Sequence, residues 1–152
     1  MLGLELKVQA GMDPEERYDQ TMRLLDRLDG SFPSGRIARE LGKSMLEHAK
    51  TRNRERQREA AEKFARYAID LDQQYGNAYL FLANLMYAKR DLEGATLLAQ
   101  KALELDFPEH RVYVLLARVA RARGEKQEEA NYWRKALYEY PDNLTYLLSL
   151  AR

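Results

Sequence analysis

The sequence predicts an all-α fold in which helical hairpins stack one after another. The first observation is a repeat, because the segments LEHAK, LFLAN, VLLAR and LSLAR end at Lys50, Asn84, Arg118 and Arg152, at one constant spacing. A fixed period of about 34 residues is typical of helical repeat proteins. The second is composition: 45% of the residues are hydrophobic and 32% are charged, in a mixture of Ala, Leu, Glu, Arg and Lys that favours helices. The third is a series of apolar faces at helical spacing, separated by turn residues.

The first segment, residues 1 to 12, does not follow the helical pattern. Leu2, Leu4, Leu6 and Val8 alternate with other residues at the period of a β-strand. A single strand has no sheet partner in this sequence. We therefore expect an extended or disordered N-terminal arm, which either frays or packs on a helix groove or another chain.

Helical signals begin at Asp13, which can cap a helix whose first position is taken by Pro14. The apolar face that follows ends at Gly30, a residue that commonly terminates helices. A second helix is expected to open near Ser34. Residues 13 to 41 are thus predicted to form a helical hairpin without the repeat signature.

The later elements fall into units of this same period. An apolar helix face starts near residue 59, and further helices are expected at about 77–90, 92–106, 110–123 and 126–139, with a last start at 143. The units are predicted at 42–75, 76–109 and 110–143. Residues 144–152 then begin a further unit or form a capping helix.

Aromatic, leucine and small residues recur at fixed places in two of these units: Tyr79, Leu82, Ala83, Ala95, Ala99, Ala102, Leu103 and Pro108 in the first, and Tyr113, Leu116, Ala117, Gly124, Trp133, Ala136, Leu137 and Pro141 in the second. This pattern resembles the tetratricopeptide repeat, a helix-turn-helix unit of about 34 residues. The resemblance implies an α-solenoid of antiparallel hairpins that curves into a right-handed superhelix. It also implies that the first helix of each hairpin lines a concave groove that binds a peptide segment of a partner protein.

The sequence departs from the family pattern at several positions. Glu129 occupies the place of a small residue on the second helix, and Ala130 follows one position late. Unit 42–75 matches weakly, and Arg56 replaces its turn glycine. We expect this unit to be a divergent repeat whose two helices are partly merged through the Arg-rich stretch.

Composition excludes several classes of function. The net charge is +1 and there is no cysteine, which argues against a protein that binds nucleic acid with its whole surface and excludes disulfides and thiol chemistry. The start MLGLELKVQAG lacks the pattern of a secretory signal, and no segment is apolar enough to span a membrane. We expect a cytoplasmic protein, or an excised domain of a longer chain.

No catalytic or metal-binding motif is present in the sequence. Its two histidines are His48, expected to be structural on an apolar helix face, and His110, expected to be solvated at a helix start. None of the common nucleotide, zinc-protease or serine-hydrolase motifs occurs. We therefore predict a protein that is not an enzyme and needs no cofactor or metal.

The groove implied by the resemblance gives the candidate site. Its partner-binding residues are predicted to be Lys50, Asn77, Leu80, Asn84, Tyr87, Arg111, Val114, Arg118, Arg121 and Arg152, with Leu46 and Asn53 beside Lys50. Lys50, Asn84, Arg118 and Arg152 would stand one above another on the groove wall. Such a ladder suits an acidic or amphipathic peptide with apolar anchors.

Two other ligand classes are disfavoured. Some members of the family hold the terminal carboxylate of chaperone tails with a Lys, Asn and Arg clamp, but only Arg111 has the required type here. The run Arg52, Arg54, Arg56 and Arg58 suggests nucleic acid, but residues two apart spread around a helix, and no aromatic side chains interleave with them.

The sequence thus predicts a non-catalytic adaptor of bacterial origin that holds a protein partner. The alternatives are an RNA-binding helical repeat and a regulatory domain excised from a larger enzyme or from a secretion or assembly protein. Leu147, Leu148 and Leu150 would lack the second helix that normally covers such residues. This last helix is expected to dock as a cap, to meet another subunit, or to continue into further chain.

Overall fold

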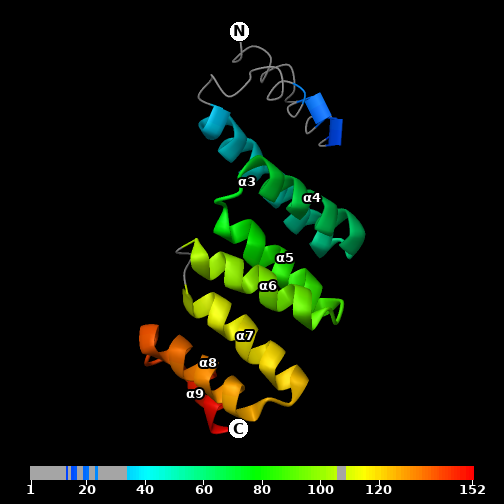
Figure 1. Ribbon diagram of the computed structural model, residues 1–152. Coiled ribbons are helices and arrows are strands. Elements are labelled where there is room, and N and C mark those ends of the chain that lie inside the picture. Colours follow the sequence, from blue (N-terminus) through cyan, green and yellow to red (C-terminus); the bar gives the residue numbers. More distant parts are fainter. Residues whose placement is uncertain (1–12, 14, 17–18, 21–22, 24–33, 106–108) are drawn as a thin grey trace. The chain divides into compact units, whose positions relative to one another are not determined.

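The computed structural model describes residues 13, 15–16, 19–20, 23, 34–105 and 109–152. The N-terminal arm predicted for residues 1–12 and most of the first helix predicted after Asp13 lie outside the described residues. The chain divides into two compact units, Met1–Gln73 and Gln74–Arg152. Within the described ranges it forms helices joined by turns and no strand, which confirms the all-α fold class (Figure 1).

In the first unit, α3 (Ser34–Arg54) packs against α4 (Arg58–Leu71) as a hairpin (Figure 1). Small residues let the two helices approach closely: a Cβ atom added to Gly42 would lie 3.2 Å from the backbone oxygen of Ala68, and Ala49 and Ala61 are completely buried. The boundary drawn between residues 41 and 42 falls inside α3, because the helix continues without interruption through it.

The two helices of this unit are separate, so the expectation that they merge through the Arg-rich stretch is wrong. The backbone of Arg56 adopts the left-handed conformation, with φ of 62°. The Gln57 N–H then donates to the Arg52 oxygen at 2.8 Å, and the Arg56 N–H donates to the Asn53 oxygen at 3.0 Å. These two bonds form a Schellman motif, which satisfies the last carbonyl groups of α3 and reverses the chain.

The second unit contains two hairpins and a final helix. The first hairpin is α5 (Gly76–Ala88) with α6 (Leu92–Glu104), and the second is α7 (Glu109–Arg123) with α8 (Lys126–Glu139). Helix α6 packs against α7, and α8 packs against α9 (Leu144–Ala151), so the elements stack in chain order (Figure 1). The helices expected from residue 77 onward are confirmed within about two residues at each end.

The alanines that recur once in every repeat explain the packing. Ala49, Ala83 and Ala117 each lie at the centre of a hairpin and are fully buried. Ala151 has the same place in the repeat but is exposed. In the described chain, no second helix follows α9 to cover this face.

Helix α9 therefore presents an apolar surface. Leu144, Leu147 and Leu148 are 66%, 44% and 54% exposed, and no residue of this helix is fully buried. None of the helices in the described ranges is long and apolar enough to cross a membrane.

Candidate functional site

Three helices of the second unit, α5, α7 and α9, surround a small open depression of about 190 Å³, which we call the basic groove. It is lined by Leu80, Asn84, Arg111, Val114, Leu115, Arg118 and Tyr146. Each of these helices is the first of a pair or the start of a new one. The residues of the groove therefore come from equivalent elements of successive repeats.

The spacing of residues along each helix explains why these side chains share one face. Arg111, Leu115 and Arg118 are separated by four and three residues on α7, so they follow one another along one side of the helix. Leu80 and Asn84 are one turn apart on α5, and the Asn84 side-chain nitrogen donates to the Leu80 oxygen at 2.9 Å.

Tyr146 reaches the basic groove because of a helix cap. The Asn143 side chain accepts a hydrogen bond from the Tyr146 N–H at 3.2 Å and so starts α9 at this point. The Tyr146 ring also lies 5.8 Å from the Trp133 ring, centroid to centroid. The tyrosine is thereby held between the basic groove and Trp133 of α8.

The basic groove combines positive charge with an apolar floor. Arg111 and Arg118 are exposed, and neither pairs with a carboxylate of the described residues. Leu80 and Leu115 are buried beneath them. Burial raises the pKa of the Tyr146 phenol and Tyr140 adds to this rise, whereas Arg118 and Arg111 oppose it. The phenol therefore stays protonated at neutral pH and can donate a hydrogen bond.

The structure brings half of the predicted site residues together. Leu80, Asn84, Arg111, Val114 and Arg118 line the basic groove. Sequence reasoning missed Tyr146, although Asn143 three residues earlier is a capping signal that places Tyr146 in the first turn of α9.

The other predicted residues lie elsewhere. Asn77 is exposed in the first turn of α5, and Tyr87 is half-buried near its end. Lys50 belongs to the first unit, where its Nζ atom lies 2.8 Å from the carboxylate of Glu47. Leu46, expected beside Lys50 in the groove, is completely buried in the core of its unit.

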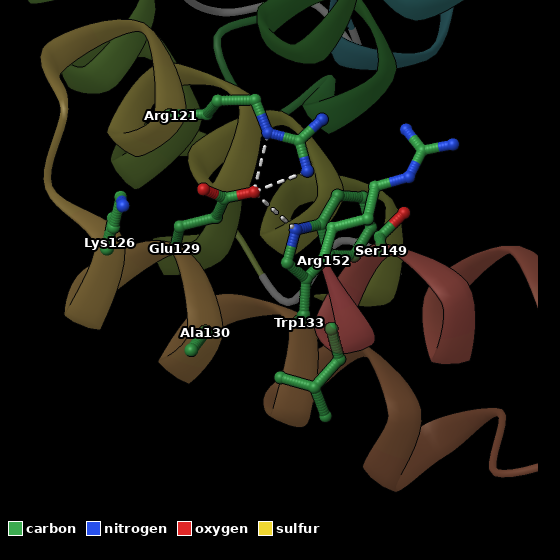
Figure 2. Close-up of a pocket in the computed structure, with 8 residues that line it drawn as sticks. Arg121, Lys126, Glu129, Ala130, Trp133, Ser149 and Arg152 are labelled. Atoms are coloured by element: carbon green, nitrogen blue, oxygen red, sulfur yellow. Dashed lines mark hydrogen bonds and ion pairs between the residues drawn. The ribbon is translucent and has the colours of Figure 1, made fainter.

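Arg121 and Arg152 line a different hollow, of about 360 Å³, which we call the Trp133 pocket (Figure 2). Its lining residues are Arg121 from α7, Lys126, Glu129, Ala130 and Trp133 from α8, and Ser149, Leu150 and Arg152 at the end of α9. The ladder predicted from Asn84 through Arg118 to Arg152 is thus divided between two hollows.

A carboxylate organises the Trp133 pocket. One oxygen of Glu129, Oε1, accepts from Arg121 Nε at 2.6 Å and from Trp133 Nε1 at 3.3 Å (Figure 2). Glu129 occupies the place of Ala61 and Ala95, which are fully buried in the other hairpins. The replacement of a small residue by Glu129 therefore changes the packing of this hairpin, because the larger side chain links α7 to α8 by an ion pair.

In the described chain, no three His, Cys, Asp or Glu side chains are placed to hold a metal ion. His110 is not solvated as expected. Its ring centroid lies 4.3 Å from that of Tyr140, and its Nδ1 atom lies 3.5 Å from a carboxylate oxygen of Glu139. His48 lies against Phe64, with 6.0 Å between ring centroids.

Comparison with known proteins identifies the fold. The sequence matches no protein-family model and no curated protein. Among solved structures, the TPR domain of Arabidopsis OM64 is similar over 76% of this chain and 95% of its own, with 22% identity and a TM-score of 0.70. The chain has the tetratricopeptide-repeat fold. The resemblance seen in the sequence is thus confirmed at the level of fold.

Two further tetratricopeptide-like matches are longer than this chain. YrrB, described as a TPR protein with an unusual peptide-binding site, matches over 70% of this chain and 55% of its own, with 18% identity and a TM-score of 0.63. PilF of Pseudomonas aeruginosa matches over 90% of this chain and 60% of its own, with 18% identity and a TM-score of 0.63. The matched region therefore spans only about half to two-thirds of these two proteins.

Proposed function

We propose that this protein is a non-catalytic interaction module that binds an acidic segment of a partner protein in the basic groove. The observation that carries the proposal is the position of Arg111 and Arg118, which have no carboxylate partner among the described residues, above an apolar floor. A carboxylate of the partner would pair with these guanidinium groups, and an adjacent apolar side chain would cover Leu80 and Val114.

The polar groups at the rim of the basic groove suit such a ligand. The Tyr146 hydroxyl can donate to a carboxylate or to a backbone carbonyl. Asn84 gives one of its amide hydrogens to Leu80, which leaves a second hydrogen and the side-chain oxygen for a backbone group of the partner. A volume of about 190 Å³ accommodates one or two side chains. We therefore expect recognition of a short segment by a few anchor residues.

The fold supports a protein partner in general terms. YrrB has a peptide-binding site, as its description says, and a peptide ligand for the present chain is our proposal by analogy with that protein. The chain covers 55% and 60% of YrrB and PilF. A role as one interaction domain of a larger assembly, including a regulatory domain of an enzyme, is compatible with those lengths.

An RNA-binding repeat is the alternative, and the charges of the first unit argue against it. Arg52 Nη1 lies 3.2 Å from the carboxylate of Glu55, and Arg54 donates to the Thr51 hydroxyl. Part of the positive charge of this Arg-rich stretch is therefore neutralised by a carboxylate of the same turn. A nucleic-acid surface needs many unpaired cations facing phosphates.

Peptide selection followed by affinity measurement tests the proposal. Random short peptides displayed on phage would be selected on the full chain, and the enriched sequences should contain Asp or Glu beside Leu, Ile or Phe. Fluorescence anisotropy of a labelled selected peptide should then give an affinity at least about tenfold weaker for Arg118→Glu, since the change replaces a favourable charge by a repulsive one.

Arg54→Glu is the matched control, because it makes the same charge change at an exposed residue of the first unit. Its effect on the peptide affinity should stay within about threefold at physiological ionic strength, because Arg54 does not line the basic groove and salt screens exposed charges. The opposite ranking of the two variants, together with tight binding of single-stranded RNA and a steep dependence on salt, would contradict the proposal and favour the nucleic-acid alternative.

A further inference from the structure

We infer that the Trp133 pocket is a second subsite for the same bound segment and takes a second acidic side chain. This inference rests on the function proposed for the basic groove. It adds a property that the basic groove alone lacks, namely selection of partners by the spacing between two carboxylates.

The two hollows follow one another along the same pair of helices. On α7, Arg118 lines the basic groove, and Arg121, one turn later, lines the Trp133 pocket. On α9, Tyr146 lines the basic groove, and Ser149 and Leu150, one turn later, line the Trp133 pocket. A segment that lies along α7 and α9 would therefore pass from one hollow into the other.

The Trp133 pocket carries an excess of positive charge. Among the lining side chains, Arg121, Lys126 and Arg152 are three cations, and Glu129 is a single carboxylate that already pairs with Arg121. Lys126 and Arg152 have no ion-pair partner among the described residues. A carboxylate is the complement of these two free cations.

Internal contacts fix the shape of this subsite. Glu129 holds the Arg121 guanidinium against α8, and the same carboxylate oxygen accepts from the Trp133 indole (Figure 2). Trp133 is almost fully buried, so its indole forms a rigid apolar wall together with Ala130 and Leu150. A subsite held in one conformation loses little entropy when a ligand enters.

Helix geometry gives the expected spacing of the two acidic residues. Arg121 marks the position of the Trp133 pocket on α7. With a rise of about 1.5 Å per residue, it lies about 4.5 Å beyond Arg118 and about 15 Å beyond Arg111 along the axis of α7. An extended peptide advances about 3.3 Å per residue. Two carboxylates separated by roughly two to four residues should therefore reach both hollows at once.

A spacing series tests this inference. The probes are peptides based on one sequence selected on the basic groove, each with one extra Glu placed from one to about seven residues away from the first. Affinity should peak when the separation is about two to four residues, by about three- to fivefold over the peptide with a single Glu. Trp133 is the only tryptophan of the chain, so its emission should change with the peptides that carry the second Glu in this range and little with the others.

Three variants separate this subsite from the basic groove. Lys126→Glu should abolish the gain from the second Glu, and its effect on the single-Glu peptide should be no larger than that of Arg134→Glu. Glu129→Gln should increase the gain, because it removes the internal carboxylate but keeps an acceptor for the Trp133 N–H. Arg134→Glu is the control, since Arg134 is exposed on α8, donates to Asn131, and lines neither hollow.

The possible failures can be told apart. If the single-Glu peptide binds and loses affinity on Arg118→Glu, but affinity does not depend on spacing and Trp133 emission does not change, the second subsite is wrong and the proposed function stands. If Arg134→Glu removes the gain as fully as Lys126→Glu does, the gain comes from general charge, and the subsite is again wrong. If no peptide binds the wild-type chain, both the subsite and the proposed function fail.

Discussion

Single residues at the turns decide how each hairpin closes. Arg56, Arg90 and Gly124 have φ angles of 62°, 68° and 77°, and they occupy the same position in successive repeats of the described chain. At each turn the following N–H donates to a carbonyl five residues earlier, from Gln57 to Arg52, from Asp91 to Met86 and from Glu125 to Ala120. The same Schellman motif therefore closes all three hairpins, although only one of them has the glycine that this conformation favours.

The left-handed backbone at these turns predicts opposite changes in the free energy of unfolding for substitutions at two equivalent positions. Gly124→Ala should lower the free energy of unfolding by about 1 kcal/mol, because an alanine strains the left-handed backbone. A Cβ atom at this residue would meet no other atom within 4 Å, so the cost is purely conformational. Arg90→Gly should be stabilising by up to about 1 kcal/mol.

Urea unfolding followed by circular dichroism would measure both changes. Arg90→Ala is the control, since it removes the arginine side chain and keeps the strain. If Arg90→Gly is no more stable than Arg90→Ala, the left-handed turn at this position is not a source of strain.

At the scale of elements, the helices could be predicted from the sequence because their signals are local. Apolar periodicity and capping residues placed the elements from residue 34 onward, and the fully buried Ala49, Ala83 and Ala117 explain the period of the repeat. The turn at Arg56 was missed, because an arginine does not signal a turn. Only comparison with the neighbouring repeats shows that a turn is required at this position.

The candidate site could be predicted only in part, because it depends on contacts between elements. Helical spacing was enough to bring Arg111, Val114 and Arg118 onto one face. It could not show that Glu129 of α8 pairs with Arg121, nor that the cap at Asn143 brings Tyr146 to the groove. Pairing between side chains of different helices depends on how those helices pack, which a single sequence does not give.

Hairpin packing leads to a second stability prediction. Ala117→Leu should lower the free energy of unfolding by about 1 to 3 kcal/mol, because the added atoms have no space where α7 meets α8. Ala122→Leu is the control on the same helix, where the residue is exposed, and its effect should be within about 0.5 kcal/mol. Equal effects of the two substitutions in thermal or urea unfolding would show that residue 117 is not a packing position.

At the scale of the whole molecule, the residues that pack the hairpins differ from the residues that we propose to bind a ligand. Alanines at the hairpin centres hold α5 to α6 and α7 to α8, and this leaves the outer positions of α5, α7 and α9 for a ligand. In the function we propose, recognition depends on the side chains at those positions, because the fold itself hosts many partners. Arg111, Arg118 and Tyr146 are the residues that give this particular groove its charge and its hydrogen-bond donor.

The central claim is that a partner segment binds in the basic groove, and NMR titration tests it most directly. A peptide selected on the wild-type chain would be titrated into the isotopically labelled protein, and the backbone and side-chain amide shifts would be followed. The account predicts the largest changes at Asn84, Arg111, Arg118 and Tyr146, with small changes on α4 and on the outer face of α6. Changes concentrated on α4 or α6, with those four residues unaffected, would contradict it.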